Sequence, residues 1–193
     1  MSIEPVYVVV PLANDANDEW TNVGPNFALR AKQAVHEYYA LWKQDVVVLI
    51  AQGAGAPANR FRDVTLATLG QKYIQRYWMV PVVICNADEY DVYGTLAEMR
   101  WVVAAVQAKY PRRKICFTFV TQPRHLRRVK IIARYFLPQE NCLYRFVSSE
   151  QSKEIPLYHE VRSYIGLGLT MCGLGGLVRF IRKRLLLGID RAR

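Results

Sequence analysis

The sequence lacks the clustered cysteine and histidine ligands that metal sites and redox motifs require. Its 193 residues include four cysteines and three histidines, which form neither a CxxC pair nor an HExxH segment. Cys85, Cys116 and Cys142 fall in apolar runs typical of strands, so we expect buried free thiols in a reducing compartment. A paired-carboxylate or nucleophile-elbow signature is also absent, and the sequence therefore leaves open whether the protein is an enzyme.

Acidic side chains are scarce relative to basic ones. The chain has 26 Lys and Arg residues against 16 Asp and Glu residues, a net charge of +10, and residues 112–134 contain no acid at all. A second basic cluster lies near the C-terminus: Arg179, Arg182, Lys183, Arg184, Arg191 and Arg193. This balance predicts an anionic partner, which could be a phosphorylated ligand, nucleic acid or acidic lipid.

The sequence also lacks a long apolar run. Residues 163–178 carry no charge, but this stretch is shorter than the roughly 20 residues that a helix needs to span a bilayer. Near the N-terminus, Glu4 precedes a short apolar run and no basic segment is found, which disfavours a cleaved secretory signal. We therefore expect a cytoplasmic location, with peripheral attachment to the inner face of the membrane as the alternative.

What the chain does contain is enough apolar sequence for one substantial core. Apolar residues make up 52% of the chain and aromatic residues 12%, which excludes a disordered or low-complexity protein. This length favours a single α/β domain at residues 1–155, followed at residues 156–193 by a C-terminal helix with a basic tail. That helix is expected to pack on the domain. Attachment to a membrane surface or a partner is the alternative, and a true span is the least favoured.

Strand and helix patterns alternate along the domain. Short, mostly β-branched apolar runs predict five strands, at residues 6–12, 46–51, 80–85, 115–121 and 143–147. Between these strands, apolar residues recur at helical spacing and predict four helices. The apolar residues of these helices are, in chain order, Phe27, Ala31, Ala34, Tyr38 and Trp42; Leu66, Leu69, Tyr73 and Tyr77; Leu96, Met99, Val103 and Val106; and Leu126, Val129, Ala133 and Phe136. This alternation predicts a Rossmann-like, doubly wound α/β fold, with a mainly parallel five-stranded sheet, helices on both faces and an extra C-terminal helix.

The most informative segment is the junction between the fourth strand and the next helix. Thr121 ends the strand, Pro123 suits a first helical turn, and His125 and Arg128 are spaced to share one helix edge. Helix-start N–H groups, a hydroxyl, an imidazole and a guanidinium then converge where a phosphate or carboxylate is favoured. His125, whose ordinary pKa lies near neutrality, is a candidate general acid or base. The alternative is that His125 caps the helix and the arginines lie on a solvated face.

A second candidate segment precedes the third helix. Asp91 and Thr95 are possible helix caps, and Glu98 follows Thr95 by one turn on the same edge. The T-x-x-E pattern is also a capping box, so a purely structural role is the alternative. Because this loop leaves the carboxyl end of a strand, we assign Glu98 as a candidate acid or base and Thr95 as a hydrogen-bond donor.

The loops after the first two strands should line the same crevice, since the first strand borders the switch point of a doubly wound sheet. Asn14 is a candidate ligand-binding residue there. Oxygen ligands at Asn14, Asp15, Asn17, Asp18 and Glu19 could hold a divalent cation, but their spacing fits no metal pattern and a solvated turn is favoured. Gly53 and Gly55 formally match a dinucleotide fingerprint, yet Pro57 interrupts the pattern and the strand is the second one. We predict close backbone approach at these glycines, without a standard nicotinamide site.

Several short segments occur in an order typical of one protein family. They are Pro11-Leu-Ala, Arg30 with Ala34, Gln52-Gly, Thr95-x-x-Glu98, Val120-Thr-x-x-x-His-x-x-Arg128 and Tyr158-His-Glu160. In this order the chain resembles the YdcF, SanA and ElyC group of bacterial proteins of unknown function. The resemblance implies a Rossmann-like domain with a pocket at the strand carboxyl ends. It also implies a ligand of the S-adenosylmethionine type, as suggested for one branch, or a role in the cell envelope.

Three functions follow as hypotheses. The first is a small-molecule-binding protein of this type for an anionic, phosphorylated or nucleotide-like ligand, with His125 and Arg128 on the anion and Thr95 and Thr121 as donors. The second is a membrane-associated factor in cell-envelope biogenesis without catalysis. The third is a nucleic-acid-binding module, which is demoted because Phe117 and Phe119 fall inside a predicted buried strand.

Overall fold

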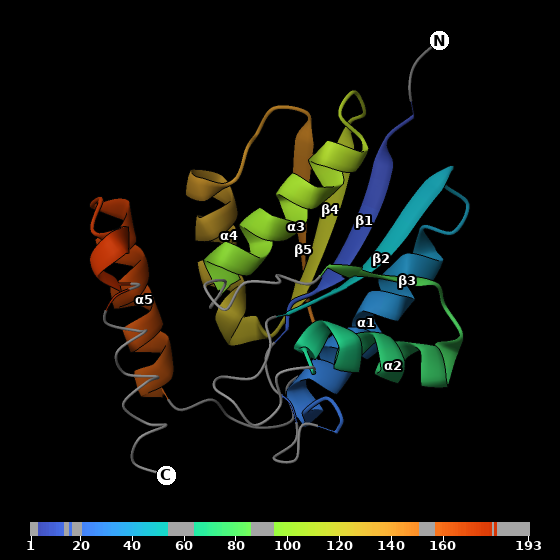
Figure 1. Ribbon diagram of the computed structural model, residues 1–193, viewed down its shortest axis with the longest axis horizontal. Coiled ribbons are helices and arrows are strands. Elements are labelled where there is room, and N and C mark those ends of the chain that lie inside the picture. Colours follow the sequence, from blue (N-terminus) through green and yellow to red (C-terminus); the bar gives the residue numbers. More distant parts are fainter. Residues whose placement is uncertain are drawn as a thin grey trace.

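A parallel five-stranded sheet forms the centre of the protein (Figure 1). The computed structural model describes residues 4–13, 16, 21–53, 64–85, 95–150, 157–178 and 180. The strands are β1 (Val6–Pro11), β2 (Val46–Gln52), β3 (Val82–Cys85), β4 (Ile115–Thr121) and β5 (Cys142–Ser148). They lie in the order β3-β2-β1-β4-β5, and every neighbouring pair is parallel. Strands β2 and β3 are added on one side of β1, and β4 and β5 on the other, so the strand order reverses between β1 and β4. Ligands bind at this point in sheets of this kind.

Helices cover both faces of this sheet. They are α1 (Pro25–Ala40), α2 (Leu66–Trp78), α3 (Thr95–Lys109) and α4 (Pro123–Phe136), with α5 (Leu157–Met171) outside the layer of α3 and α4. Successive residues of β1 show the two faces: Val9 packs with residues of α1 and α2, whereas Val8 and Val10 pack with residues of α3 and α4. The predicted doubly wound α/β fold is confirmed.

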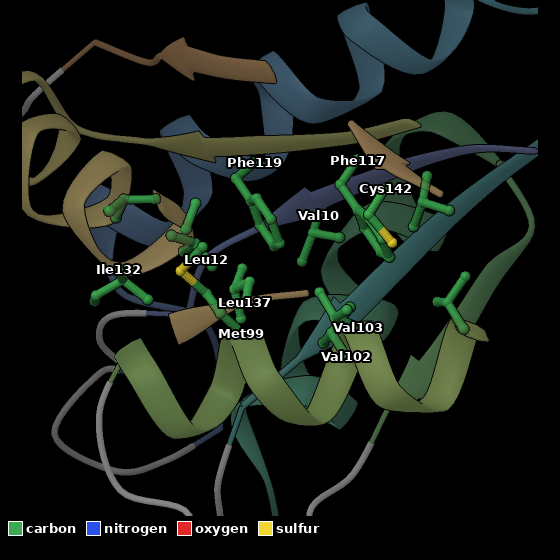
Figure 2. Packing of buried hydrophobic residues seen from close by; sticks show 14 of the residues in the cluster. Val10, Leu12, Met99, Val102, Val103, Phe117, Phe119, Ile132, Leu137 and Cys142 are labelled. Carbon is green, nitrogen blue, oxygen red and sulfur yellow. The ribbon is translucent and has the colours of Figure 1, made fainter. Parts of the chain in front are cut away.

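The larger core lies between the sheet and the layer of α3 and α4. Figure 2 shows Met99, Val102 and Val103 of α3 directed toward the strand residues Phe117 and Phe119. The phenylalanine rings stack within the core and are fully buried. The expectation that these two aromatic residues are hidden is confirmed, and neither offers a stacking surface for a base.

Some predicted element boundaries and faces are wrong. α1 ends at Ala40, so Trp42 lies in the following turn and is 67% exposed instead of continuing the apolar face. Tyr77 belongs to α2 but is 56% exposed, in ring contact with Tyr73 and Trp78. The strand predicted at residues 80–85 begins only at Val82, after a proline that has no N–H for the sheet.

The C-terminal segment is not the single helix that was predicted. α5 is followed by a turn at residues 172–174, where Gly173 has a φ of +82°, and helical conformation resumes at residue 175. Positive φ interrupts a right-handed helix and suits glycine. α5 packs beside α4 and buries Leu167 in the larger core. None of the described helices combines the length and apolar character that crossing a membrane requires.

Candidate anion-binding site

The candidate site lies at the carboxyl ends of β1 and β4, where the strand order reverses. β4 ends at Thr121, Gln122 is the N-cap of α4, and Pro123 occupies the first helical turn as predicted. Pro123 suits this place because its fixed φ matches the helix and its missing N–H would have no partner there. His125 and Arg128 therefore lie near the start of α4, directly after the buried end of the strand.

His125 and Arg128 contact each other. A terminal nitrogen of Arg128 lies 3.1 Å from Nδ1 of His125, and Arg128 is only 8% exposed. A guanidinium can only donate, so Nδ1 accepts and the imidazole proton resides on Nε2. The alternative that the arginines lie on a solvated face is thus wrong for Arg128, although it holds for the exposed Arg124 and Arg127.

Burial changes the chemistry predicted for His125. Its pKa is lowered from 6.5 to about 3, mainly by desolvation and then by the positive charges of Arg128 and Arg30. The imidazole is therefore neutral at pH 7, with its proton on Nε2. The assignment of His125 as a general acid or base stays a prediction.

The group that does titrate near neutrality is Glu98. Desolvation raises its pKa from 4.5 to about 7, and this is partly offset by the charge of Arg30, a polar interaction with the Gln52 amide and the charge of Arg128. Glu98 lies on α3 one turn after Thr95, the first residue of that helix, and both are partly buried. The structure thus brings Glu98 into the same electrostatic environment as Arg128. Its role as an acid or base stays a prediction.

Arg30 is the main site residue that the sequence prediction did not select. This arginine on α1 is 1% exposed, donates to the backbone carbonyl oxygens of Leu12 at 2.7 Å and Ala13 at 3.4 Å, and donates to Oε1 of Gln122 at 2.5 Å. It therefore ties the end of β1 to the end of β4. A signal was present, because Arg30 lies next to Ala31 on a helix face that also carries Phe27, and the family resemblance includes it.

Gln52 and Gln122 were likewise missed, and both are buried at strand ends. Among the described residues, Nε2 of Gln122 and Oγ1 of Thr121 are buried without a hydrogen-bond partner. Leaving a buried polar group unpaired costs about 1–3 kcal/mol. An acceptor atom on a ligand would meet this need, since both groups can donate.

The remaining predicted residues are placed as follows. Gly53 has a φ of +147°, and a Cβ there would lie 2.5 Å from Cβ of Leu66 and 2.8 Å from Cβ of Ala13. The backbone at Gly53 thus closely approaches other residues of the protein, Leu66 and Ala13. Asn14, Gly55 and Asp91 lie outside the described residues, as do Asp15, Asn17, Asp18 and Glu19. Within the described part of the chain, no group of three His, Cys, Asp or Glu residues could hold a metal.

A groove of about 380 Å³ lies elsewhere, between α1 and α2. Its lining includes Lys32 and the aromatic rings of Tyr73, Tyr77 and Trp78, but no predicted site residue. The groove and the polar site at the sheet edge are therefore separate features.

Comparisons of the chain with protein-family models, curated proteins and solved structures gave no match. The resemblance to the YdcF, SanA and ElyC group stays a prediction.

Proposed function

We propose that the protein binds an anionic small molecule, phosphorylated or nucleotide-like, between the carboxyl ends of β1 and β4. One observation carries the proposal: Oγ1 of Thr121 and Nε2 of Gln122 are buried without a hydrogen-bond partner among the described residues. Leaving such groups unpaired is costly, and an acceptor atom of a ligand would pair them. The buried guanidinium groups of Arg30 and Arg128, which both act on Glu98, favour an acceptor that carries negative charge.

The contacts suggest a division of roles between the two arginines. Arg30 already donates to Leu12, Ala13 and Gln122, so it holds the strand ends in place and contributes its charge. Arg128 is anchored at one nitrogen by His125, and the planar fork of its guanidinium is suited to a phosphate or carboxylate oxygen.

Neutral donors complete the proposed site. Thr121 and Gln122 carry the buried donors without a partner among the described residues, and His125 adds its Nε2 proton. A ligand of the S-adenosylmethionine type, which the family resemblance implies, would place its carboxylate on the same donors.

The proposal is tested by calorimetric titration with inorganic phosphate, AMP and S-adenosylmethionine. We expect at least one of them to bind, and Arg128→Ala to weaken it by about tenfold to a hundredfold, the value of a hydrogen bond to a charged group. Arg127→Ala is the matched control, since it removes the same charge from an exposed neighbour. No binding of any of the three, or equal loss in both variants, would refute the assignment.

Arg128→Ala removes a buried side chain, so folding of the variant is checked by circular dichroism. Arg128→Lys gives a second test, because it keeps the charge but not the fork. It should weaken binding less than the alanine variant and more than Arg127→Ala.

A further inference from the structure

The outer side of α5 carries exposed apolar side chains. Val161 and Ile165 lie one helical turn apart and are 49% and 59% exposed. Gly168 and Cys172, also exposed, continue this face without a charge. Met171 at the end of α5 continues the apolar character, and the segment after it adds Leu174, Leu177 and Phe180. These four side chains are 46–55% exposed.

The opposite side of α5 is fixed to the domain. Leu167 is 8% exposed and belongs to the larger core, and α5 packs against α4. Figure 1 shows α5 beside α4 and farthest from the sheet. The apolar face of Val161 and Ile165 therefore points away from the domain and does not cover any part of its core.

The charges around this face indicate what it contacts. Residues 163–178 carry no charge, and the next fifteen residues carry the C-terminal basic cluster with one acid, Asp190. An apolar face with cations at its end is typical of segments that insert side chains among lipid tails and place Lys and Arg near anionic headgroups.

We propose that α5 and the segment up to Phe180, here called the α5 face, form a docking surface for an anionic phospholipid bilayer. The helix lies in the plane of the headgroups with Val161 and Ile165 directed into the bilayer. The rest of the domain stays in water, held through the contact of Leu167 with the core. This surface is independent of the site proposed at the carboxyl edge of the sheet.

The test is co-sedimentation of the full chain with vesicles of two compositions: phosphatidylcholine alone, and an equal mixture of phosphatidylcholine and phosphatidylglycerol. We expect binding to the mixed vesicles and at least about tenfold weaker binding to the neutral ones, because several cations follow the apolar face in the sequence. A double variant, Ile165→Glu with Leu177→Glu, should weaken binding to the mixed vesicles by at least about tenfold, since it removes two inserted side chains and adds two repelled charges.

The matched control is Met79→Glu, which makes the same change at a side chain that is 90% exposed after α2. It should leave vesicle binding within about twofold, because the cations and the α5 face remain. All substituted side chains are exposed, so circular dichroism should show unchanged folding.

Three results would overturn the proposal. The first is equal binding of the double variant and the Met79→Glu control, which would assign binding to surface charge elsewhere. The second is absence of binding to both kinds of vesicle. The third is that the unaltered protein sediments as a dimer, the double variant sediments as a monomer, and neither protein binds vesicles. This result would assign the α5 face to a second copy of the chain.

Discussion

Replacing Glu98 with glutamine should make the protein more stable above neutral pH. In the folded state the pKa of Glu98 is raised from 4.5 to about 7, mainly by desolvation. The folded protein therefore holds a proton that the unfolded chain releases, and stability falls as pH rises from 4.5 to about 7. Glutamine has nearly the same shape as glutamate but does not ionise, so the stability of the variant should not fall in this way as pH rises.

The shift sets the size of the effect. A pKa difference of about 2.5 corresponds to about 3 kcal/mol, since one pKa unit is about 1.4 kcal/mol. We compare the unfolding free energy of Glu98→Gln with that of the unaltered protein at about pH 4.5 and at about pH 8. Relative to the unaltered protein, the variant should be more stable at the higher pH than at the lower pH by about 3 kcal/mol. Urea unfolding at these two pH values measures it.

A carboxyl-to-amide change also removes a charge from the protein, so the comparison needs a matched control. Glu140→Gln makes the same change at an exposed residue outside the site, and its stability difference from the unaltered protein should stay within about 0.5 kcal/mol at both pH values. If Glu98→Gln behaved like Glu140→Gln, Glu98 would not be buried beside the two arginines with its pKa raised, and the electrostatic account of the site would fail.

Three further changes test other parts of the structure. The unaltered protein should lose stability as pH falls from 6.5 toward 3, because the unfolded chain binds a proton that the folded imidazole does not bind. His125→Gln should lack this loss, and urea unfolding of both proteins at about pH 4 and about pH 7 measures the difference. Thr121→Val, which removes a buried hydroxyl with no partner among the described residues, should raise stability by about 1 kcal/mol and weaken phosphate or nucleotide binding; a parallel loss of both would contradict the role given to this hydroxyl. Gly53→Ala should destabilise the fold by about 1–3 kcal/mol in thermal unfolding, since its φ and its neighbours exclude a Cβ; Gly168→Ala, with open space around it, is the control and should be neutral or stabilising.

The fold was predictable because its signals are local. Each strand is a short apolar run, and the spacing of residues such as Met99 and Val103 identified the buried side of a helix. The error at Trp42 has the same origin: apolar spacing continues past Ala40, but the helix does not. Periodicity describes which side of a helix can be buried, and it does not show where the backbone turns.

The site was predictable only in part, because its properties depend on residues from several elements. Thr121, His125 and Arg128 were selected from one continuous segment. The structure places Thr121 at the end of β4 and brings His125 and Arg128 into contact near the start of α4. The lowered pKa of His125 depends on burial and on Arg30, a residue of α1. Sequence reasoning treated Arg30 only as part of a resemblance, since no local pattern shows that a guanidinium on a helix is buried against two strand ends.

The bridge that Arg30 makes has a consequence for how the protein folds. Leu12 and Gln122 are far apart in the sequence, and Arg30 connects them only when β4 has docked beside β1. The proposed binding site should therefore form late in folding, together with the longest-range strand pairing, because no single βαβ unit contains all of its residues. A bound anion would hold this final step closed, so amide hydrogens of β1, α1 and β4 should exchange more slowly as a group when the ligand is present.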